Sequence, residues 1–190
     1  MKSNCKEEDW VYINTDDDSA RFVLGEPGKK NLVIIGINAS FAEPCDENLD
    51  PTLKRVKKFS KKFGYDGWLM LNVYPQRATD PKEIHKEIHK KQIKELTERN
   101  QEEIKKLFAK YEIDAVWAAW GNNIKRRKFL PGALKKIVKI IPENIKWIKV
   151  GDYTVKHHPR HPLQRIKDFD QTKPSCFKIK DYMKLFSHEQ

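Results

Sequence analysis

The sequence has few cysteines, and they form none of the patterns that hold metals. Cys5, Cys45 and Cys176 are the 3 cysteines; they lie far apart, and no Cys-x-x-Cys pair occurs. This spacing excludes a zinc ribbon and a cysteine-held iron–sulfur cluster. An odd number of widely separated cysteines predicts free thiols, which fit a reducing compartment, so we expect a cytoplasmic protein.

Long apolar runs are lacking as well. No run is long enough to cross a bilayer, and no apolar stretch follows the first residues, so we expect neither a membrane span nor a secretory signal. The length of 190 residues suits one domain, and we find no internal repeat or low-complexity linker. We therefore predict a single domain over 1–190, with a frayed start at 1–9, a hairpin at 10–24, a core at 31–163 and an extension at 164–190.

Acidic residues are too few to balance the basic ones. The chain has 38 Lys and Arg against 27 Asp and Glu, which gives a net charge of +11. A basic excess favours polyanions through counterion release, so it predicts contact with nucleic acid or a nucleotide. Most of the excess is lysine, so solvated lysine-rich helices that reflect biased composition are the alternative.

Continuous apolar runs indicate strands that are buried on both faces. Four such runs are present, with helical patterns between them: Asn31–Asn38, Gly67–Val73, Ile113–Gly121 and Ile145–Val150. Strands that alternate with helices predict βαβ units and a mostly parallel sheet covered on both faces. We expect a three-layer α/β/α fold with a short, mostly parallel, four-stranded central sheet, plus the N-terminal hairpin.

Helix boundaries can be placed by their end signals. Asp50 is a predicted N-cap with proline at the first helical position, and Gly64 ends that helix. A second helical pattern covers Pro81–Lys110, as one helix or as two that break near Asn100, and a third covers Asn123–Ile140. The tail over 177–186 fits either a strand or a helix.

Ligands of such folds bind beyond the carboxyl ends of the strands. Polar residues follow all four predicted strands, so we expect them to converge at one rim. They are Asn38, Ser40, Asn72, Arg77, Asn122, Asn123, His158 and His161.

Several of these side chains could have a structural role instead of contacting a ligand. The Asn38 amide could hold a water or a base edge, or it could stabilise a turn. Asn72 could satisfy its hydrogen bonds on a nucleobase or on a neighbouring loop. Arg77 could clamp a phosphate or pair with an acid, and Asp80 before Pro81 is more simply a helix N-cap.

The loop His157–Leu163 is rich in histidine and proline. Its prolines stiffen the backbone, which suits a group that must be held in place. A histidine there could stabilise a developing anion or act as an acid or base, and Arg160 could meet a phosphate. The alternative is a surface loop with incidental histidines.

A basic run and a histidine pair are two further candidates for binding a ligand. Lys125, Arg126 and Arg127 begin a dense basic run that could track a phosphate backbone or simply face solvent. His85 and His89 have the i, i+4 spacing of metal ligands, but the segment lacks the His-Glu-x-x-His pattern. We therefore expect no metal site, and no motif indicates a cofactor.

Several short strings occur in a set order along the chain: Gly36–Ser40, Asp50–Thr52, Leu71–Asn72, Arg77–Pro81, Asn100, Trp120–Asn122 and Pro159–Leu163. In these strings and their order the chain resembles the bacterial and phage "domain of unknown function 1643" family, from about Arg21 to Leu163. One difference is Ala39, which stands where the family usually has proline.

The order of motifs is also similar, more distantly, to the uracil-DNA glycosylase superfamily. That family has a Gly-x-(Asp/Asn)-Pro motif that activates water, a base-reading asparagine, a Trp-Gly string and a final His-Pro-Ser motif. The corresponding positions are Asn38, Asn72, Trp120–Gly121 and His158–Pro159, with His161 as the competing histidine. Asn38 replaces the stronger aspartate, as in the mismatch-specific branch, and Arg160 replaces serine. Phe41 is the nearest candidate for the stacking aromatic residue.

This resemblance implies a uracil-DNA-glycosylase-like fold and hydrolysis of an N-glycosidic bond on an extruded nucleotide. Asn38 would position water, Asn72 would read the base, and His158 or His161 would stabilise the leaving base. Ser40, Phe41, Arg77, Asn122 and Arg160 would contact the substrate, and Lys125, Arg126 and Arg127 would hold phosphates.

Two alternatives stay open. One is a nucleotide- or nucleic-acid-binding module without the chemistry, which the lack of an aspartate at position 38 favours. The other is a different hydrolase that uses Asp46 or Asp50 as its acid or base.

Overall fold

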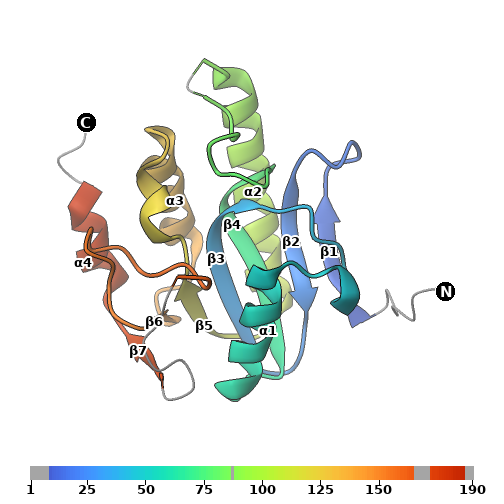
Figure 1. Ribbon diagram of the computed structural model, residues 1–190, viewed down its shortest axis with the longest axis vertical. Helices are drawn as coiled ribbons and strands as arrows, with labels where there is room; N and C mark the ends of the chain where they lie inside the picture. Colours follow the sequence, from blue (N-terminus) through green and yellow to red (C-terminus); the bar gives the residue numbers. More distant parts are fainter. Residues whose placement is uncertain (1–8, 87, 165–171, 187–190) are drawn as a thin grey trace.

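One mixed β-sheet organises the part of the chain that the computed structural model describes, residues 9–86, 88–164 and 172–186 (Figure 1). Its seven strands lie in the order β1-β2-β4-β3-β5-β6-β7. They are β1 (Val11–Asn14), β2 (Arg21–Glu26), β3 (Asn31–Ala39), β4 (Gly67–Arg77), β5 (Ile113–Ala118), β6 (Lys146–Val150) and β7 (Pro174–Cys176).

The middle of the sheet is parallel and its edges are antiparallel. β3 pairs in parallel with β4 and β5, and β5 pairs in parallel with β6. These are the four strands predicted from the apolar runs. The predicted size of the sheet is wrong, because the hairpin β1–β2 joins it through β4 and β7 pairs with β6. Both additions cover strand edges that would otherwise expose unpaired backbone groups.

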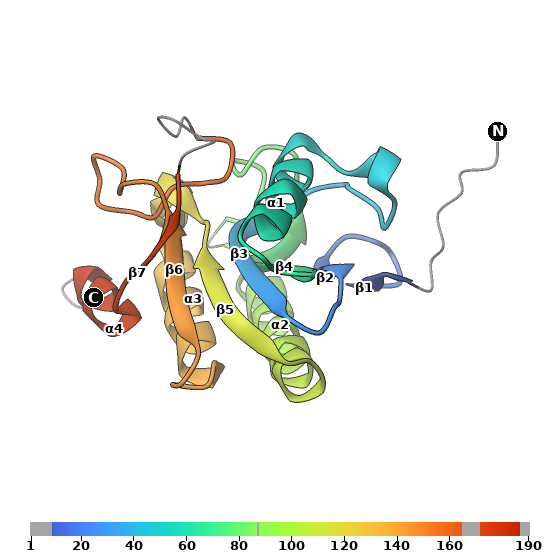
Figure 2. The ribbon, with the colours of Figure 1, turned by 90° about the horizontal axis from the view of Figure 1, so that it is seen from below.

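Helices cover both faces of the sheet (Figure 2). Helix α1 (Pro51–Lys62) lies on one face, and α2 (Lys90–Lys110) and α3 (Phe129–Ile140) lie on the other. Alternate residues of each central strand enter the two cores. Ile34 packs with the α1 residues, whereas Ile35 packs with those of α2 and α3. Burial on both faces explains why the central strands are continuously apolar.

The helix boundaries agree with the sequence signals only in part. Asp50 caps α1 as predicted, and its Oδ1 accepts a hydrogen bond from the Leu53 amide at 2.8 Å. The helix predicted from Pro81 begins instead at Lys90 and continues unbroken through Asn100. The pattern predicted from Asn123 divides into a 3-10 helix (Gly121–Lys125) and α3.

The tail over 177–186, for which the sequence fits either a strand or a helix, forms helical elements. Strand β7 precedes the short helix α4 (Ile179–Met183) and a 3-10 helix (Lys184–Phe186). Cys176 is exposed and free, but Cys45 is disulfide-bonded, so the prediction of free thiols is wrong for Cys45. The segments predicted to fray at 1–9 and to extend at 164–190 lie partly outside the described residues. No described helix has the length and hydrophobicity that spanning a membrane requires.

Candidate functional site

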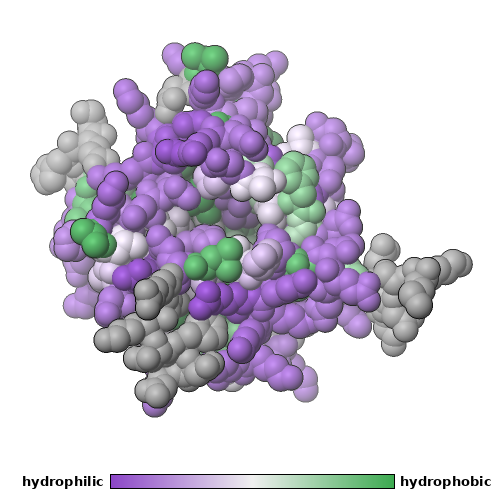
Figure 3. Space-filling view, viewed as in Figure 1, coloured by the Kyte–Doolittle hydropathy of each residue, from purple (hydrophilic) through white to green (hydrophobic). Residues whose placement is uncertain are grey.

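A cavity of about 600 Å³ opens at the carboxyl end of β3, and its volume lies in the usual range for ligand sites. Loops after all four parallel strands reach it, through Ser40 after β3, Thr79 after β4, Asn123 after β5 and His161 after β6, and Asn38 joins them from the end of β3. The start of α1 and part of β2 complete the wall. The centre of this face is hollowed and partly apolar within a mostly hydrophilic surround (Figure 3).

Asn38 contributes one half of its amide to local structure. Its Nδ2 donates to the backbone oxygens of Ala78, at 2.7 Å, and Ala39, at 3.1 Å. These bonds tie the end of β3 to the loop after β4. Within the described chain no donor reaches the Asn38 Oδ1, so this half-buried side chain retains an acceptor at the cavity wall.

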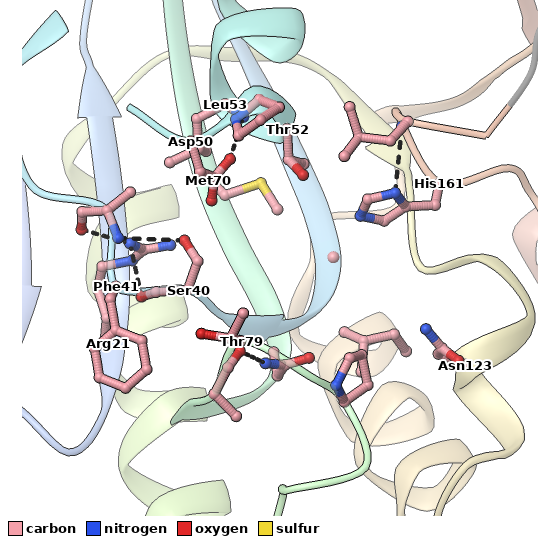
Figure 4. Close-up of a pocket in the computed structure, with 18 of the residues that line it drawn as sticks. Arg21, Ser40, Phe41, Asp50, Thr52, Leu53, Met70, Thr79, Asn123 and His161 are labelled. Atoms are coloured by element: carbon pink, nitrogen blue, oxygen red, sulfur yellow. Dashed lines mark hydrogen bonds between the residues drawn. The ribbon is translucent and has the colours of Figure 1, made fainter. Parts of the chain in front are cut away.

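Asp50 combines a structural contact with a place in the cavity wall (Figure 4). One carboxylate oxygen receives the Leu53 amide, and the described residues give the carboxylate no ion pair. Asp46, the other candidate acid from the sequence, does not line the cavity and pairs with Lys57 at 2.6 Å.

The His161 ring has a defined tautomer in its neutral form. Its Nδ1 accepts a hydrogen bond from the Leu163 amide at 3.2 Å, so the proton of the neutral ring is on Nε2 (Figure 4). Burial lowers the pKa of His161 below its usual value, and the Asp50 carboxylate offsets part of the shift. The ring is therefore neutral at pH 7, with Nε2–H as a donor.

Gly121 allows the His161 loop to approach the end of β5. Its amide donates to the Pro159 oxygen at 3.0 Å, and its φ is +61°. A Cβ at Gly121 would lie 3.2 Å from the His161 Cβ. Glycine is suited to this position because it adopts positive φ without steric cost and leaves room for the histidine.

His158 lies apart from the cavity, in an aromatic cluster. The side chain is 1% exposed, its Nδ1 is 2.9 Å from the Tyr182 hydroxyl, and its ring stacks on Phe186. Of the two histidines proposed from the sequence, only His161 lines the cavity. The contacts of His158 with Tyr182 and Phe186 match a structural role.

Asn72 is also buried away from the cavity wall. It is 1% exposed, and its side-chain nitrogen, in the amide orientation that its neighbours favour, donates to the Asn38 backbone oxygen at 3.0 Å. The Asn100 amide in turn donates to the Asn72 backbone oxygen at 2.9 Å. These contacts match the structural alternative. A Cβ at Gly36, beside it in the sheet, would lie 2.9 Å from the Asn72 amide and 2.6 Å from Met70 Cε.

Arg77 holds the loop after β3. Its guanidinium donates to the oxygens of Ser40, at 3.0 Å, and Ala42, at 3.2 Å, and it forms an ion pair with Asp18. Of the two roles considered for Arg77 from the sequence, a phosphate clamp and pairing with an acid, these contacts match the second. Ser40 and Phe41 line the cavity, and Phe41 is 59% exposed, with the Arg77 guanidinium 5.1 Å from its ring centroid.

Sequence reasoning missed Arg21, which lines the same cavity. This arginine is 1% exposed, and its Nη1 donates to the backbone oxygens of Ala42, at 2.8 Å, and Ser40, at 3.2 Å. Burial lowers the pKa of Arg21 to about 10, and the neighbouring Arg77 cation adds to the shift. The available signal was an arginine within an apolar strand, because a charge is rarely buried without a specific partner.

The remaining predicted contacts are used mainly within the protein. Asn122 Oδ1 accepts the Thr154 hydroxyl at 2.6 Å, and Arg160 Nε donates to the Asp152 oxygen at 2.9 Å. Arg127 donates to backbone oxygens of the 82–85 segment. None of these three side chains lines the cavity, and neither do Lys125 and Arg126, which are exposed.

The histidine pair does not form a metal centre. His85 and His89 stack with ring centroids 5.2 Å apart, and His85 Nδ1 is 2.7 Å from the Tyr74 hydroxyl. Among the described residues, no group of three or more side chains has the geometry to hold a metal ion.

Residues 21–163 match one family model, described as "Protein of unknown function (DUF1643)". The match includes every cavity-lining side chain named above. No curated protein and no solved structure matches the chain.

Proposed function

Because the chain belongs to the DUF1643 family, whose description names no activity, we propose its function from the cavity: hydrolysis of the N-glycosidic bond of a nucleotide, free or in DNA. One observation carries the proposal. A carboxylate, Asp50, and a neutral imidazole donor, His161, line the same cavity, and the carboxylate is near enough to raise the pKa of the ring against the effect of burial. This hydrolysis requires a general base and a hydrogen-bond donor of the protein that face the same ligand.

Asp50 is the general base of the proposed reaction. Its carboxylate takes a proton from a water molecule while the water oxygen bonds to the sugar carbon C1′. The Asn38 Oδ1 accepts the second hydrogen of this water and orients it. General-base catalysis by a positioned carboxylate contributes roughly 10²–10⁴-fold to the rate.

His161 acts on the leaving group. The C1′–N bond breaks and its electron pair departs with the base, which becomes anionic. The neutral ring donates its Nε2–H to this anion, and the bond from the Leu163 amide to Nδ1 holds that tautomer. The base anion then takes a proton from solvent and protonated Asp50 releases its proton to solvent, which completes the reaction.

The apolar parts of the wall suit the flat face of a base. Phe41 exposes its ring at the cavity mouth, and Met70 and Leu163 also line the cavity. Aromatic side chains stack on bases without selecting among them, at about 1–3 kcal/mol per base. The proposal therefore assigns Phe41 to stacking and leaves the choice of base to the polar side chains.

Specific observations favour a second candidate, a nucleotide-binding module without hydrolysis. The Asn38 nitrogen is engaged by the Ala78 oxygen, and Asn72 does not line the cavity. The nitrogen of Asn38 and the amide of Asn72, which would act on substrate in a glycosylase, thus serve internal contacts here.

A single-turnover base-release assay separates the two. The substrates are duplex and single-stranded oligonucleotides, and the matching free nucleotides, that carry uracil, hypoxanthine, xanthine or modified pyrimidines. The variants are Asn38→Ala and His161→Ala. The matched control is His157→Asn, since His157 is exposed, lies in the same loop outside the cavity wall, and has a positive φ that asparagine tolerates.

Release by the wild type and the control, and its loss in the two cavity variants, supports the hydrolase. Salt-sensitive binding without release from any substrate supports the binding module and contradicts the hydrolase. Absence of both release and binding refutes both.

A further inference from the structure

Arg21 is a buried cation without a close counter-ion. Within the described residues it forms no ion pair, its Nε has no hydrogen-bond partner, and its Nη1 bonds reach only backbone oxygens. Its Nη2 has no hydrogen bond either, but, unlike Nε, this atom is not fully buried. Because Arg21 lines the cavity, Nη2 is the part of the guanidinium that meets the cavity space. Buried charges normally have a partner of opposite sign.

The first turn of α1 reaches the same cavity. Asp50, Pro51, Thr52 and Leu53 all line it, and α1 is 12 residues long. The Leu53 amide is capped by Asp50, and Pro51 has no amide hydrogen. Thr52 therefore carries a first-turn amide that has no acceptor within the helix. Such an amide, at the positive end of the helix dipole, attracts anions.

The geometry points to a phosphate-binding subsite between Arg21 and the start of α1. This inference rests on the proposed function and deepens it: the substrates are nucleotides bound through a phosphate, rather than nucleosides. The phosphate belongs to a free nucleotide or to the backbone of DNA. In either case Arg21 supplies a positive charge that forms no ion pair within the described residues. The α1 amide supplies a second hydrogen-bond donor.

Asp50 makes the subsite sensitive to charge in a specific way. It is the only carboxylate that lines the cavity among the described residues, and it attracts Arg21 from beyond ion-pair distance. Its charge opposes a bound phosphate. Loss of that charge should therefore tighten phosphate binding, although it abolishes the proposed hydrolysis.

Thr52 offers a matched pair of variants. Thr52→Asp places a carboxylate at the cavity wall, in the first helical turn, where acids stabilise a helix. Thr52→Asn has nearly the same shape without the charge. The two variants therefore separate charge from structure, and neither alters the contacts that Arg21 makes with the 40–42 loop.

The experiment is calorimetric titration at low salt with four probes. They are inorganic phosphate, deoxynucleosides, their 5′-monophosphates, and a short single-stranded oligonucleotide without a terminal phosphate. The proteins are the wild type, Thr52→Asp, Thr52→Asn and Asp50→Asn. Thermal unfolding of each variant confirms that it is folded.

We expect the wild type to bind a monophosphate at least about tenfold more tightly than its nucleoside. We expect Thr52→Asp to lose that advantage, Thr52→Asn to keep it, and Asp50→Asn to bind the monophosphate more tightly still. Competition by inorganic phosphate assigns the subsite to free nucleotides, and preference for the oligonucleotide assigns it to the DNA backbone. Both support the subsite.

Equal affinity for nucleoside and monophosphate, equal binding by the two Thr52 variants, or no binding at all overturns the inference. These outcomes are distinct from failure of the hydrolase. Phosphate binding that responds to Thr52→Asp, without base release, keeps the subsite and refutes the hydrolysis. Equal base release from nucleosides and nucleotides keeps the hydrolysis and refutes the subsite.

Discussion

Asp50 has two roles, as a helix N-cap and as the proposed general base, and a pair of substitutions can separate them. As N-cap of α1 it accepts the Leu53 amide at 2.8 Å, and as a wall of the cavity it presents the carboxylate to which we assign the general base. Asparagine caps a helix about as well as aspartate, but it cannot take a proton from water. Alanine supplies neither function.

The magnitudes follow from these contacts. Asp50→Asn keeps an acceptor for Leu53 and loses only the attraction of the charge for the helix dipole, about 0.3–1 kcal/mol. Asp50→Ala also loses the cap bond, which costs about 1 kcal/mol more. Both variants lose the general base, so base release should fall roughly 10²–10⁴-fold in each.

Urea denaturation measures the first effect, and single-turnover base release measures the second. Equal loss of release in two variants of different stability would show that the loss is chemical. Base release by Asp50→Asn at nearly the wild-type rate would refute the assignment of Asp50 as general base. A free energy of unfolding as low in Asp50→Asn as in Asp50→Ala would refute the capping argument.

Three other predictions concern Gly36, Arg77 and His161. Gly36→Ala should lower the free energy of unfolding by about 1–3 kcal/mol, because its Cβ would lie 2.9 Å from the amide of Asn72, which is buried and hydrogen-bonded. Gly132→Ala, with nothing within 4 Å of its Cβ, should not lower it, and equal denaturation midpoints for the two variants would contradict this. Arg77→Lys should cost about 2–3 kcal/mol, because lysine cannot reproduce the fork that holds the loop after β3, and an unchanged urea midpoint would count against that role. Burial lowers the pKa of His161, so below about pH 6.5 the unfolded chain binds a proton that the folded protein does not. The free energy of unfolding should therefore decrease as the pH is lowered below about 6.5, and His161→Gln should flatten this slope in denaturation curves measured at several pH values. A slope unaffected by that substitution would refute the assignment.

The features that were predictable from the sequence are those encoded locally. The apolar runs of β3, β4, β5 and β6 follow from burial on both faces, and the cap of α1 follows from Asp50 and the proline after it. Convergence of the strand-end loops on one cavity follows from parallel pairing. None of these needs knowledge of a distant contact.

The failures depend on contacts between distant segments. His158 and His161 are three positions apart, and the Tyr182 hydroxyl on α4 holds His158 inside while His161 lines the cavity. Arg127 binds backbone oxygens of the 82–85 segment, where the sequence pattern predicted a helix. Arg21 reaches the cavity only because β2 pairs with β4. Local patterns carry no information about such pairs.

The proposed hydrolysis requires that water attack C1′ of a nucleotide held in this cavity. The most direct test is base release in oxygen-18 water, with mass spectrometry of the sugar product. We expect free base and a sugar that carries the heavy oxygen at C1′ from the wild type, and neither product from His161→Ala. Bound nucleotide recovered intact, or a released base with no heavy oxygen in the sugar, would contradict it.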